Sequence, residues 1–302
     1  MPRAVTVGLD GSAESRTAAE WAAREAESRG LPVRLIQVWE PVPEYAAVAP
    51  LVGTETYQHR TEQILREDAG DLRLRHPALE VTAEQLVGRP AEALVRAARD
   101  AELLVLGSRG LGGIGGFLVG SVGLEVVAST QRPVVLVRAA EQTPEERTTD
   151  RTGTPETAAT PSGPVVLGLD TRHPHAAPID FAFEAAAHRG VQLRALHGWH
   201  EPYHYLYGTA PDPKVTRMVA QSDAAALSEA LQPWCQKYPD VEVVTRSSPG
   251  SPSVRLAEAS HDASLVVVGR RVRRSTVGVH IGPVTHAVLH HSTAPVAVVA
   301  HD

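Results

Sequence analysis

The sequence repeats itself at long range, and this repeat constrains the fold more than any other feature. Four segments of the first half return in the same order in the second half. They are residues 4–12 and 164–172, 35–45 and 195–205, 87–110 and 249–272, and 131–137 and 293–299. Asp10 thus corresponds to Asp170, 160 positions later. Repeats of solenoid proteins are far shorter, so we predict two tandem copies of one fold.

A polar segment divides the two copies. Residues 141–163 read EQTPEERTTDRTGTPETAATPSG and contain hardly any apolar side chains. Such a segment cannot bury enough surface to offset the entropy of ordering it. We therefore predict one domain over residues 1–140, a flexible linker over 141–163 and a second domain over 164–302. The length of 302 residues suits two domains of about 150 residues each.

Short apolar runs alternate with helical patterns along the first half. We predict strands at residues 4–9, 33–39, 80–87, 103–107 and 133–137, and helices at 13–29, 55–75, 90–101 and 119–130. Ser12 and Gly30 are the expected caps of the first helix. Continuous Val and Leu runs between helices are typical of a parallel sheet covered on both faces. The predicted fold class is α/β, with a doubly wound parallel sheet that binds ligands at the carboxyl ends of its strands.

A glycine-rich segment follows the fourth predicted strand. Residues 107–121 read GSRGLGGIGGFLVGS, and seven of these fifteen residues are glycine. Glycine lets the backbone approach a ligand closely, and the helix that follows offers free N–H groups at its start. Ser121 adds a hydroxyl group there. These features favour a loop that wraps an anionic phosphate chain over a loop without a ligand.

Three known phosphate-binding motifs are candidates for this loop. The G-x-G-x-x-G motif of dinucleotide-binding proteins occurs at Gly110, Gly112 and Gly115. However, it follows the fourth strand rather than the first, and no acidic residue ends the next strand to bind a ribose. A Walker A loop is excluded because no Gly-Lys-Ser/Thr is present. The spacing that fits is G-2x-G-9x-G-[ST], which runs from Gly107 to Ser121.

This spacing resembles the nucleotide-binding motif of the universal stress protein family. Asp10 at the end of the first strand and the duplicated layout extend the resemblance over nearly all of the chain outside the linker. It implies a tandem, two-domain form with Rossmann-like five-stranded sheets of order 3-2-1-4-5. It also implies binding of ATP or another adenine nucleotide, with Mg²⁺ as a candidate companion ion.

The resemblance also assigns roles to single residues. Asp10 would bind the ribose, and the backbone of Val38 would meet the edge of the adenine. Gly8 and Leu106 would line the base pocket. The groups that would hold the ribose and the phosphates are Gly107, Arg109, Gly110, Gly120, Ser121 and Val122. Independently of the family, an arginine such as Arg109 suits a phosphate oxygen. The alternative for Asp10 is a simple turn residue at the end of a strand.

The second copy departs from the motif. Asp170, Gly269 and Gly282 keep their places, but Val272 replaces the middle glycine and Pro283 replaces the final Ser/Thr. Valine disfavours positive φ, and proline offers no N–H. The arginines nearby could hold phosphate by charge instead; they are Arg270, Arg271, Arg273 and Arg274. Asp170, Gly269, Arg271 and Gly282 therefore form a candidate second site. The alternative is a structural half that supports the first.

The sequence favours a regulatory binding protein over an enzyme. No catalytic histidine or carboxylate lies close to the glycine loop in the sequence, and neither a Ser-His-Asp order nor a G-x-S-x-G elbow occurs. We expect a nucleotide-binding stress-response protein that recruits a protein partner. Slow ATP hydrolysis and a nucleotide-free interaction scaffold are the alternatives.

Histidines crowd the second half, where twelve of the 14 lie after residue 170. His286 and His290 stand four apart on a predicted helix, which suits metal chelation. No cysteine or acidic residue completes an evident ligand set, so we predict no metal site. The histidines are expected at the surface or at an interface.

Charge and hydropathy limit the partners further. The net charge of −6 argues against a nucleic-acid partner, which needs a basic face. A single cysteine, Cys235, excludes an intrachain disulfide. No apolar run approaches the ~18 residues of a membrane span, and the first residues lack the apolar core of a signal peptide. We expect a cytoplasmic protein. The apolar closing strands suit pairing of the two halves with each other, and a homodimer is expected.

Overall fold

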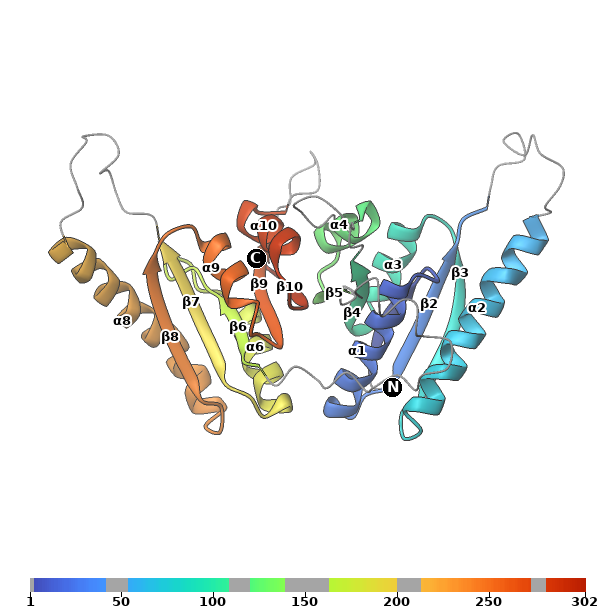
Figure 1. The fold of residues 1–302 in the computed structure, drawn as a ribbon, viewed down its shortest axis with the longest axis horizontal. Coiled ribbons are helices and arrows are strands. Elements are labelled where there is room, and N and C mark those ends of the chain that lie inside the picture. Colours follow the sequence, from blue (N-terminus) through green and yellow to red (C-terminus); the bar gives the residue numbers. More distant parts are fainter. Residues whose placement is uncertain (1–2, 42–53, 109–119, 139–162, 200–212, 273–280) are drawn as a thin grey trace, which may run out of the picture.

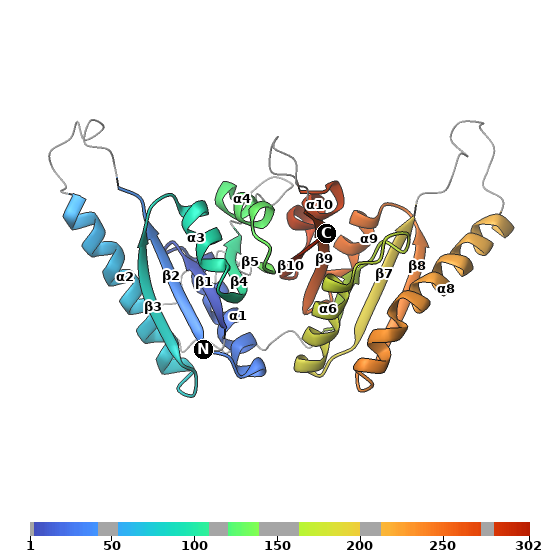
Figure 2. The same cartoon turned by 180° about the vertical axis from the view of Figure 1, so that it is seen from behind.

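The chain forms two similar halves that meet at the centre of the molecule (Figures 1 and 2). The computed structural model describes residues 3–41, 54–108, 120–138, 163–199, 213–272 and 281–302. Nearly all of the predicted linker thus lies outside the described residues. None of the helices in this described part is both long and apolar enough to span a membrane.

The first half alternates strands and helices as predicted. Its elements are β1 (Ala4–Leu9), α1 (Ala13–Arg29), β2 (Val33–Trp39), α2 (Thr54–Arg75), β3 (Val81–Val87), α3 (Pro90–Ala98), β4 (Ala101–Ser108), α4 (Ser121–Ser129) and β5 (Val134–Arg138). Ser12 caps α1 by accepting a hydrogen bond from the Ser15 N–H, and Gly30 ends it with a φ of 63°. Both expected caps are confirmed.

Two predicted helices and one predicted strand differ from the structure by two or three residues at one end. The helix predicted over 90–101 ends at Ala98, and β4 begins at Ala101 rather than at Leu103, because Ala101 already pairs with Ala4 of β1. The helix predicted over 119–130 covers Ser121–Ser129, and Thr130 is extended at its C-cap.

The second half follows the same order. Its elements are β6 (Val165–Gly168), α6 (Ala176–Arg189), β7 (Leu193–Trp199), α8 (Pro213–Lys237), β8 (Val243–Pro249), α9 (Pro252–Ala259), β9 (Leu265–Arg271), α10 (Pro283–His291) and β10 (Val296–His301). α6 is shorter than its counterpart α1 at the N-terminal end.

The ten strands form one continuous sheet of order β3-β2-β1-β4-β5-β10-β9-β6-β7-β8. Each half has the predicted 3-2-1-4-5 order. Two five-stranded sheets were predicted, and β5 and β10 join them through antiparallel pairs such as Val296 with Leu136. Pairing of the two closing strands within one chain is thereby confirmed. All other strand pairs are parallel.

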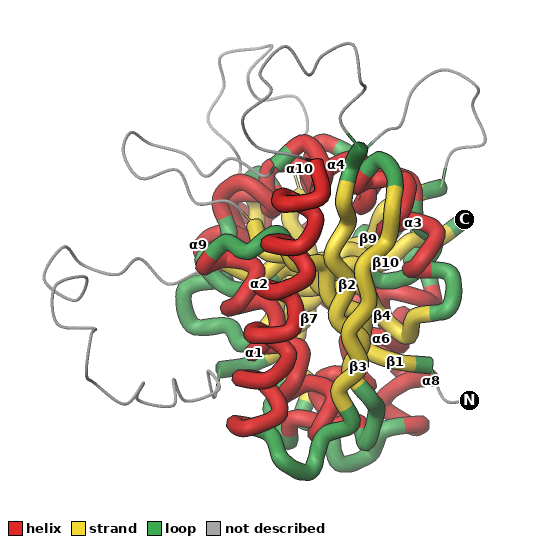
Figure 3. The backbone as a smooth tube through the Cα atoms, turned by 90° about the vertical axis from the view of Figure 1, so that its right-hand side faces the viewer, coloured by secondary structure: helices red, strands yellow, loops and turns green. Residues whose placement is uncertain are grey.

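Helices cover both faces of the sheet. α1, α2, α6 and α8 pack on one face, where their apolar side chains share a buried cluster with residues such as Leu35 and Leu193. α3, α4, α9 and α10 pack on the other face. Figure 3, which looks at the β3 end of the sheet, shows α2 and α3 on opposite sides of β2 and β3. Each cluster contains residues of both halves, so the apolar core continues across the β5–β10 junction.

Candidate functional site

The predicted first-half site lies where the strand order reverses. β1 is flanked by β2 and β4, and Gly8 pairs in register with Leu106 of β4. Asp10 follows β1 directly, Val38 lies near the end of β2, and Gly107 lies near the end of β4. The structure therefore gathers these residues at one carboxyl edge, which is the usual ligand-binding edge of a doubly wound sheet.

A side chain added at Gly8 or Gly107 would meet other atoms of the protein itself. A Cβ at Gly8 would lie 2.5 Å from a methyl group of Leu106. A Cβ at Gly107 would lie 2.6 Å from the carbonyl carbon of Glu14 and 2.7 Å from the backbone nitrogen of Ser15. The glycine at 107 thus lets the start of α1 rest against the end of β4.

Gly120 differs from these two glycines. It is the N-cap of α4, with a φ of −60° and a ψ of 152° that any residue can adopt. No described atom lies within 4 Å of a Cβ built on it. Ser121 and Val122, which follow it, are exposed. Neither conformation nor packing against the described residues explains the glycine, whereas close approach of a ligand to the start of α4 would.

Asp10 is exposed and orders the turn before α1. Its Oδ1 accepts hydrogen bonds from the backbone N–H of Ser12, at 3.0 Å, and from the Ser12 hydroxyl. These bonds hold the carboxylate at the carboxyl edge of β1. Arg109 and Gly110, the remaining predicted residues of the first site, lie outside the described residues.

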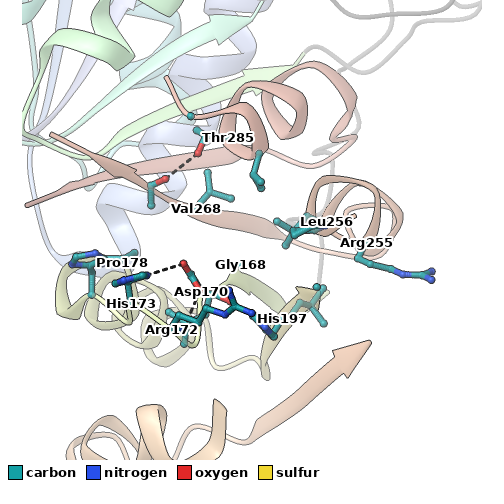
Figure 4. Close-up of a pocket in the computed structure, with 18 of the residues that line it drawn as sticks. Gly168, Asp170, Arg172, His173, Pro178, His197, Arg255, Leu256, Val268 and Thr285 are labelled. Atoms are coloured by element: carbon teal, nitrogen blue, oxygen red, sulfur yellow. Dashed lines mark hydrogen bonds and ion pairs between the residues drawn. The ribbon is translucent and has the colours of Figure 1, made fainter. Parts of the chain in front are cut away.

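The second half contains a cavity of about 740 Å³ at the corresponding edge (Figure 4). This volume lies within the usual range for small-molecule sites. All members of the candidate second site line it, namely Asp170, Gly269, Arg271 and Gly282. Pro283 also lines it, so the start of α10 presents no N–H at that position.

The segment before α6 lines one side of this cavity. Arg172 stands at the position where Ser12 caps α1, and helical conformation is disfavoured for His173 because Pro174 follows it. α6 therefore begins only at Ala176, and its N-cap His175 makes no side-chain capping bond. The side chains of Arg172 and His173 lie at the cavity beside Asp170 in Figure 4.

Asp170 organises this segment as Asp10 organises its own turn. Its Oδ1 accepts a 3.0 Å hydrogen bond from the backbone N–H of Arg172, and its Oδ2 lies 3.5 Å from Nδ1 of His173. His197 of β7 also lines the cavity; its ring contacts the carbonyl oxygen of Leu169 at 2.9 Å.

A histidine ring occupies the space beside Gly269. A Cβ at Gly269 would lie 2.9 Å from Cδ2 and Nε2 of His301. The ring of His301 stacks on that of His175, with centroids 3.8 Å apart. Burial lowers the pKa of His301, and the positive charges of His175, Arg271 and Arg270 lower it further against a hydrogen bond to Asp302 that raises it.

Sequence reasoning missed several side chains that line the cavity. They are Arg172, His173, His175, His197, Arg255 and His301. The crowding of histidines after residue 170 was the available signal. It predicted histidines at the surface or at an interface, because their convergence depends on β7, β10 and the segment before α6, which are distant in the sequence. Elsewhere, the rings of His286 and His290 lie 4.5 Å apart. No group of three metal-binding side chains occurs among the described residues.

A doubly wound parallel sheet with a ligand-binding edge at the strand-order reversal places this chain among the Rossmann-like α/β proteins. The family model for the universal stress protein family matches residues 1–138 and again residues 162–300. The chain belongs to this family and carries its domain twice in tandem.

Relatives match over nearly their full length. A universal stress protein of Mycobacterium tuberculosis is 33% identical, over 97% of this chain and 94% of its own. One of Mycolicibacterium smegmatis is 32% identical, over 98% and 96%. The crystal structure of a universal stress protein from Archaeoglobus fulgidus has a TM-score of 0.66 at 16% identity and covers 99% of this chain and 98% of its own. This last likeness supports the fold.

Proposed function

We propose that this chain is an adenine-nucleotide-binding regulatory protein of the stress response. In the first half, Asp10 and the loop from Gly107 to Ser121 hold ATP or a related nucleotide. Gly120 is the observation that carries this proposal. It begins α4 at the carboxyl edge of the sheet, yet neither its backbone conformation nor any described neighbour requires a glycine. A phosphate bound at the start of α4 would explain why position 120 carries no side chain.

The remaining residues of the site keep the roles assigned from the family resemblance. The backbone of Val38 meets the adenine, while Gly8 and Leu106 line its pocket. The phosphates and ribose are held by Gly107, Arg109, Gly110, Gly120, Ser121 and Val122. Mg²⁺, if it accompanies ATP, is coordinated mainly by phosphate oxygens and water, which is its usual preference. Asp170, Gly269, Arg271 and Gly282 form the second site.

Regulation rather than catalysis suits this arrangement. Asp10 is engaged with Ser12, and hydrolysis would need a group that orients the attacking water. A partner would then distinguish the nucleotide-bound from the nucleotide-free chain, in the cytoplasm and as a homodimer. A slow ATP hydrolase and a nucleotide-free scaffold are the competing functions.

The first experiment identifies the ligand directly. Protein purified without added nucleotide is heat-denatured, and the supernatant is analysed by chromatography and mass spectrometry. About one ATP or ADP per chain is expected when the first site alone is filled, and about two when both are filled. Asp10→Ala should lose the first-site nucleotide, while Asp170→Ala should retain it.

Two results would reject the proposal. One is absence of nucleotide together with no thermal shift on adding ATP, which would support the scaffold. The other is rapid multiple-turnover hydrolysis that Asp10→Ala abolishes, which would support an enzyme.

A further inference from the structure

Gly107 and Gly269 occupy equivalent positions of the sheet in the two halves but have different neighbours. In the first half, the glycine at 107 faces the backbone of Glu14 and Ser15 at the start of α1. In the second half, the glycine at 269 faces the ring of His301, and α6 begins later. The first turn of the helix has thus been replaced by a non-helical turn over residues 171–175 and an imidazole ring.

This replacement makes one side of the second-half cavity cationic. Arg172, His173 and His175 come from the segment before α6, while Arg271 and His301 come from β9 and β10. In the first half, the positions of Arg172, His173 and His175 are Ser12, Ala13 and Ser15. Arg271 corresponds to Arg109 of the first half, so the duplication supplies this arginine, whereas Arg172, His173 and His175 are specific to the second half.

The charges around His301 are mainly positive. Arg270 and Arg271 lie on the neighbouring strand β9, and His175 stacks on its ring from the start of α6. Asp302 contributes an oxygen that contacts Nδ1 at 3.1 Å. Arg270 is directed into the junction of the halves, where it donates a hydrogen bond to the Thr130 carbonyl. Asp170 contacts His173 at the other end of the segment.

We propose that this side of the second-half cavity is a phosphate-binding subsite built from Arg172, His175, Arg271 and His301, and that it binds more tightly as the pH falls. Charged side chains here take the place of backbone N–H donors, because Val272 disfavours the positive φ of the motif glycine and Pro283 has no N–H. A phosphate dianion relieves the repulsion among these cations and favours protonation of the histidine pair. By linkage, each proton taken up on binding makes affinity increase about tenfold per pH unit lost within the titration range.

Proton uptake gives a direct test on the unaltered full-length chain. The ring-proton signals of the histidines are followed by NMR across pH, with and without saturating inorganic phosphate. The signals of His301 and His175 are assigned by their loss in His301→Gln and His175→Gln. Phosphate should move both titrations to higher pH. Unchanged titrations at saturating phosphate would overturn the proposal, and this result does not depend on whether a variant folds.

Binding measured by calorimetry gives a second test. Sulfate stays a dianion over this range, whereas inorganic phosphate itself takes up a proton near neutral pH. Sulfate should bind the wild-type chain at least tenfold more tightly at about pH 5.5 than at about pH 8. The double variant His175→Gln/His301→Gln should lose this pH dependence. His59→Gln, at an exposed position on α2, should retain it. An equal loss in the control, or no pH dependence in the wild type, would contradict the subsite.

AMP distinguishes the two sources of the phosphate group. Equal affinity for AMP and inorganic phosphate would show a subsite that recognises phosphate alone. Tighter binding of AMP, with the same shift of His301, would show that the cavity also holds the nucleoside. The inference does not rest on the first-half nucleotide, so all measurements are repeated with Asp10→Ala. Loss of ATP from that variant with an unchanged His301 shift separates the two proposals.

Discussion

The guanidinium of Arg270 in the second half donates a 2.6 Å hydrogen bond from Nη2 to the carbonyl oxygen of Thr130 in the first half. The reverse contact exists as well, because Nη2 of Arg138 donates to the carbonyl oxygen of Leu289 at 2.7 Å. Thr130 is the C-cap of α4, and Leu289 lies in the last turn of α10. An arginine of one half thus meets the negative end of a helix whose start lies at the candidate site of the other half.

Replacing Arg270 should weaken the junction of the halves. Arg270 is 5% exposed, so Arg270→Ala leaves the carbonyl of Thr130 without this donor in a buried place. We expect a loss of about 2 kcal/mol in the free energy of unfolding, as for other hydrogen bonds to charged groups. Urea unfolding followed by circular dichroism measures it. Arg66→Ala is the control, because Arg66 forms an exposed pair with Glu62 and should cost less than about 0.5 kcal/mol.

A buried ion network also links the halves. Glu25 accepts from Nε of Arg29 at 2.7 Å and from Nη2 of Arg189 at 2.7 Å, and all three side chains are at most 8% exposed. Each arginine also lies over an aromatic ring of the other half: Arg29 over Phe181 and Arg189 over Trp21. One carboxylate of the first half therefore neutralises an arginine from each half.

Removing the charge of Glu25 should be strongly destabilising. Glu25→Gln keeps the shape of the side chain but leaves two buried guanidinium groups without their shared carboxylate. The expected cost is about 3 kcal/mol at neutral pH, which is typical of a broken buried pair. Urea unfolding is compared with Glu62→Gln, which removes one partner of the exposed pair on α2. Similar small effects of both substitutions would contradict a structural role for the network.

The same residue should make stability depend on acid pH. Burial alone raises the pKa of Glu25, but the charges of Arg189 and Arg29 and their hydrogen bonds outweigh it and leave the pKa below its ordinary value. The unfolded chain therefore binds the proton first as the pH falls. The contribution of Glu25 is fully present above about pH 5 and declines below the usual glutamate pKa of about 4.3. The difference in unfolding free energy between wild type and Glu25→Gln should shrink in this range.

His301 should also make stability depend on pH, but at a higher pH than Glu25. Its pKa is lowered by burial and by His175, Arg271 and Arg270, so the folded chain favours the neutral ring. Below the ordinary histidine pKa of about 6.5, the unfolded chain takes up the proton and stability falls. In buffer without phosphate, His301→Gln should show a smaller loss of stability on acidification than wild type. An equal loss would show that other groups dominate.

Much of the fold followed from the sequence because its signals are local. Ser12 and Gly30 mark the ends of α1, and apolar runs separated by helical patterns define the parallel strands. Pairing of β5 with β10 was predicted from their apolar side chains. The antiparallel register of this pair was not, because it depends on how residues about 160 positions apart are brought together, such as Leu136 and Val296.

The candidate sites were predictable to different extents. The spacing from Gly107 to Ser121, together with Asp10 and the family resemblance, predicted a first site at one edge of the sheet. Arg271 was predicted as part of the second site, but Arg172, His175 and His301 were not, because the two histidines meet only after β10 is placed beside α6. The sequence also could not separate glycines needed for packing from those available to a ligand. Gly107 and Gly120 belong to the same motif but have different surroundings.

This difference gives the last prediction. Gly107→Ala places a Cβ 2.6 Å from backbone atoms of Glu14, so α1 must move, and a cost of about 2 kcal/mol in unfolding free energy is expected. Gly120→Ala meets no described atom within 4 Å and keeps an allowed φ of −60°. Its nucleotide-free stability should stay within about 0.5 kcal/mol of wild type.

Gly120→Ala should weaken ATP binding although it hardly changes stability. If a phosphate approaches the start of α4, the added methyl group of Gly120→Ala occupies its path, and ATP affinity should fall at least tenfold without a change in the fold. Thermal shift and calorimetry with ATP, AMP and cAMP measure this. Gly70→Ala in α2 is the control, because its Cβ also meets no described atom within 4 Å and no part of either candidate site includes it. Full ATP affinity in Gly120→Ala would mean that the phosphates do not reach α4.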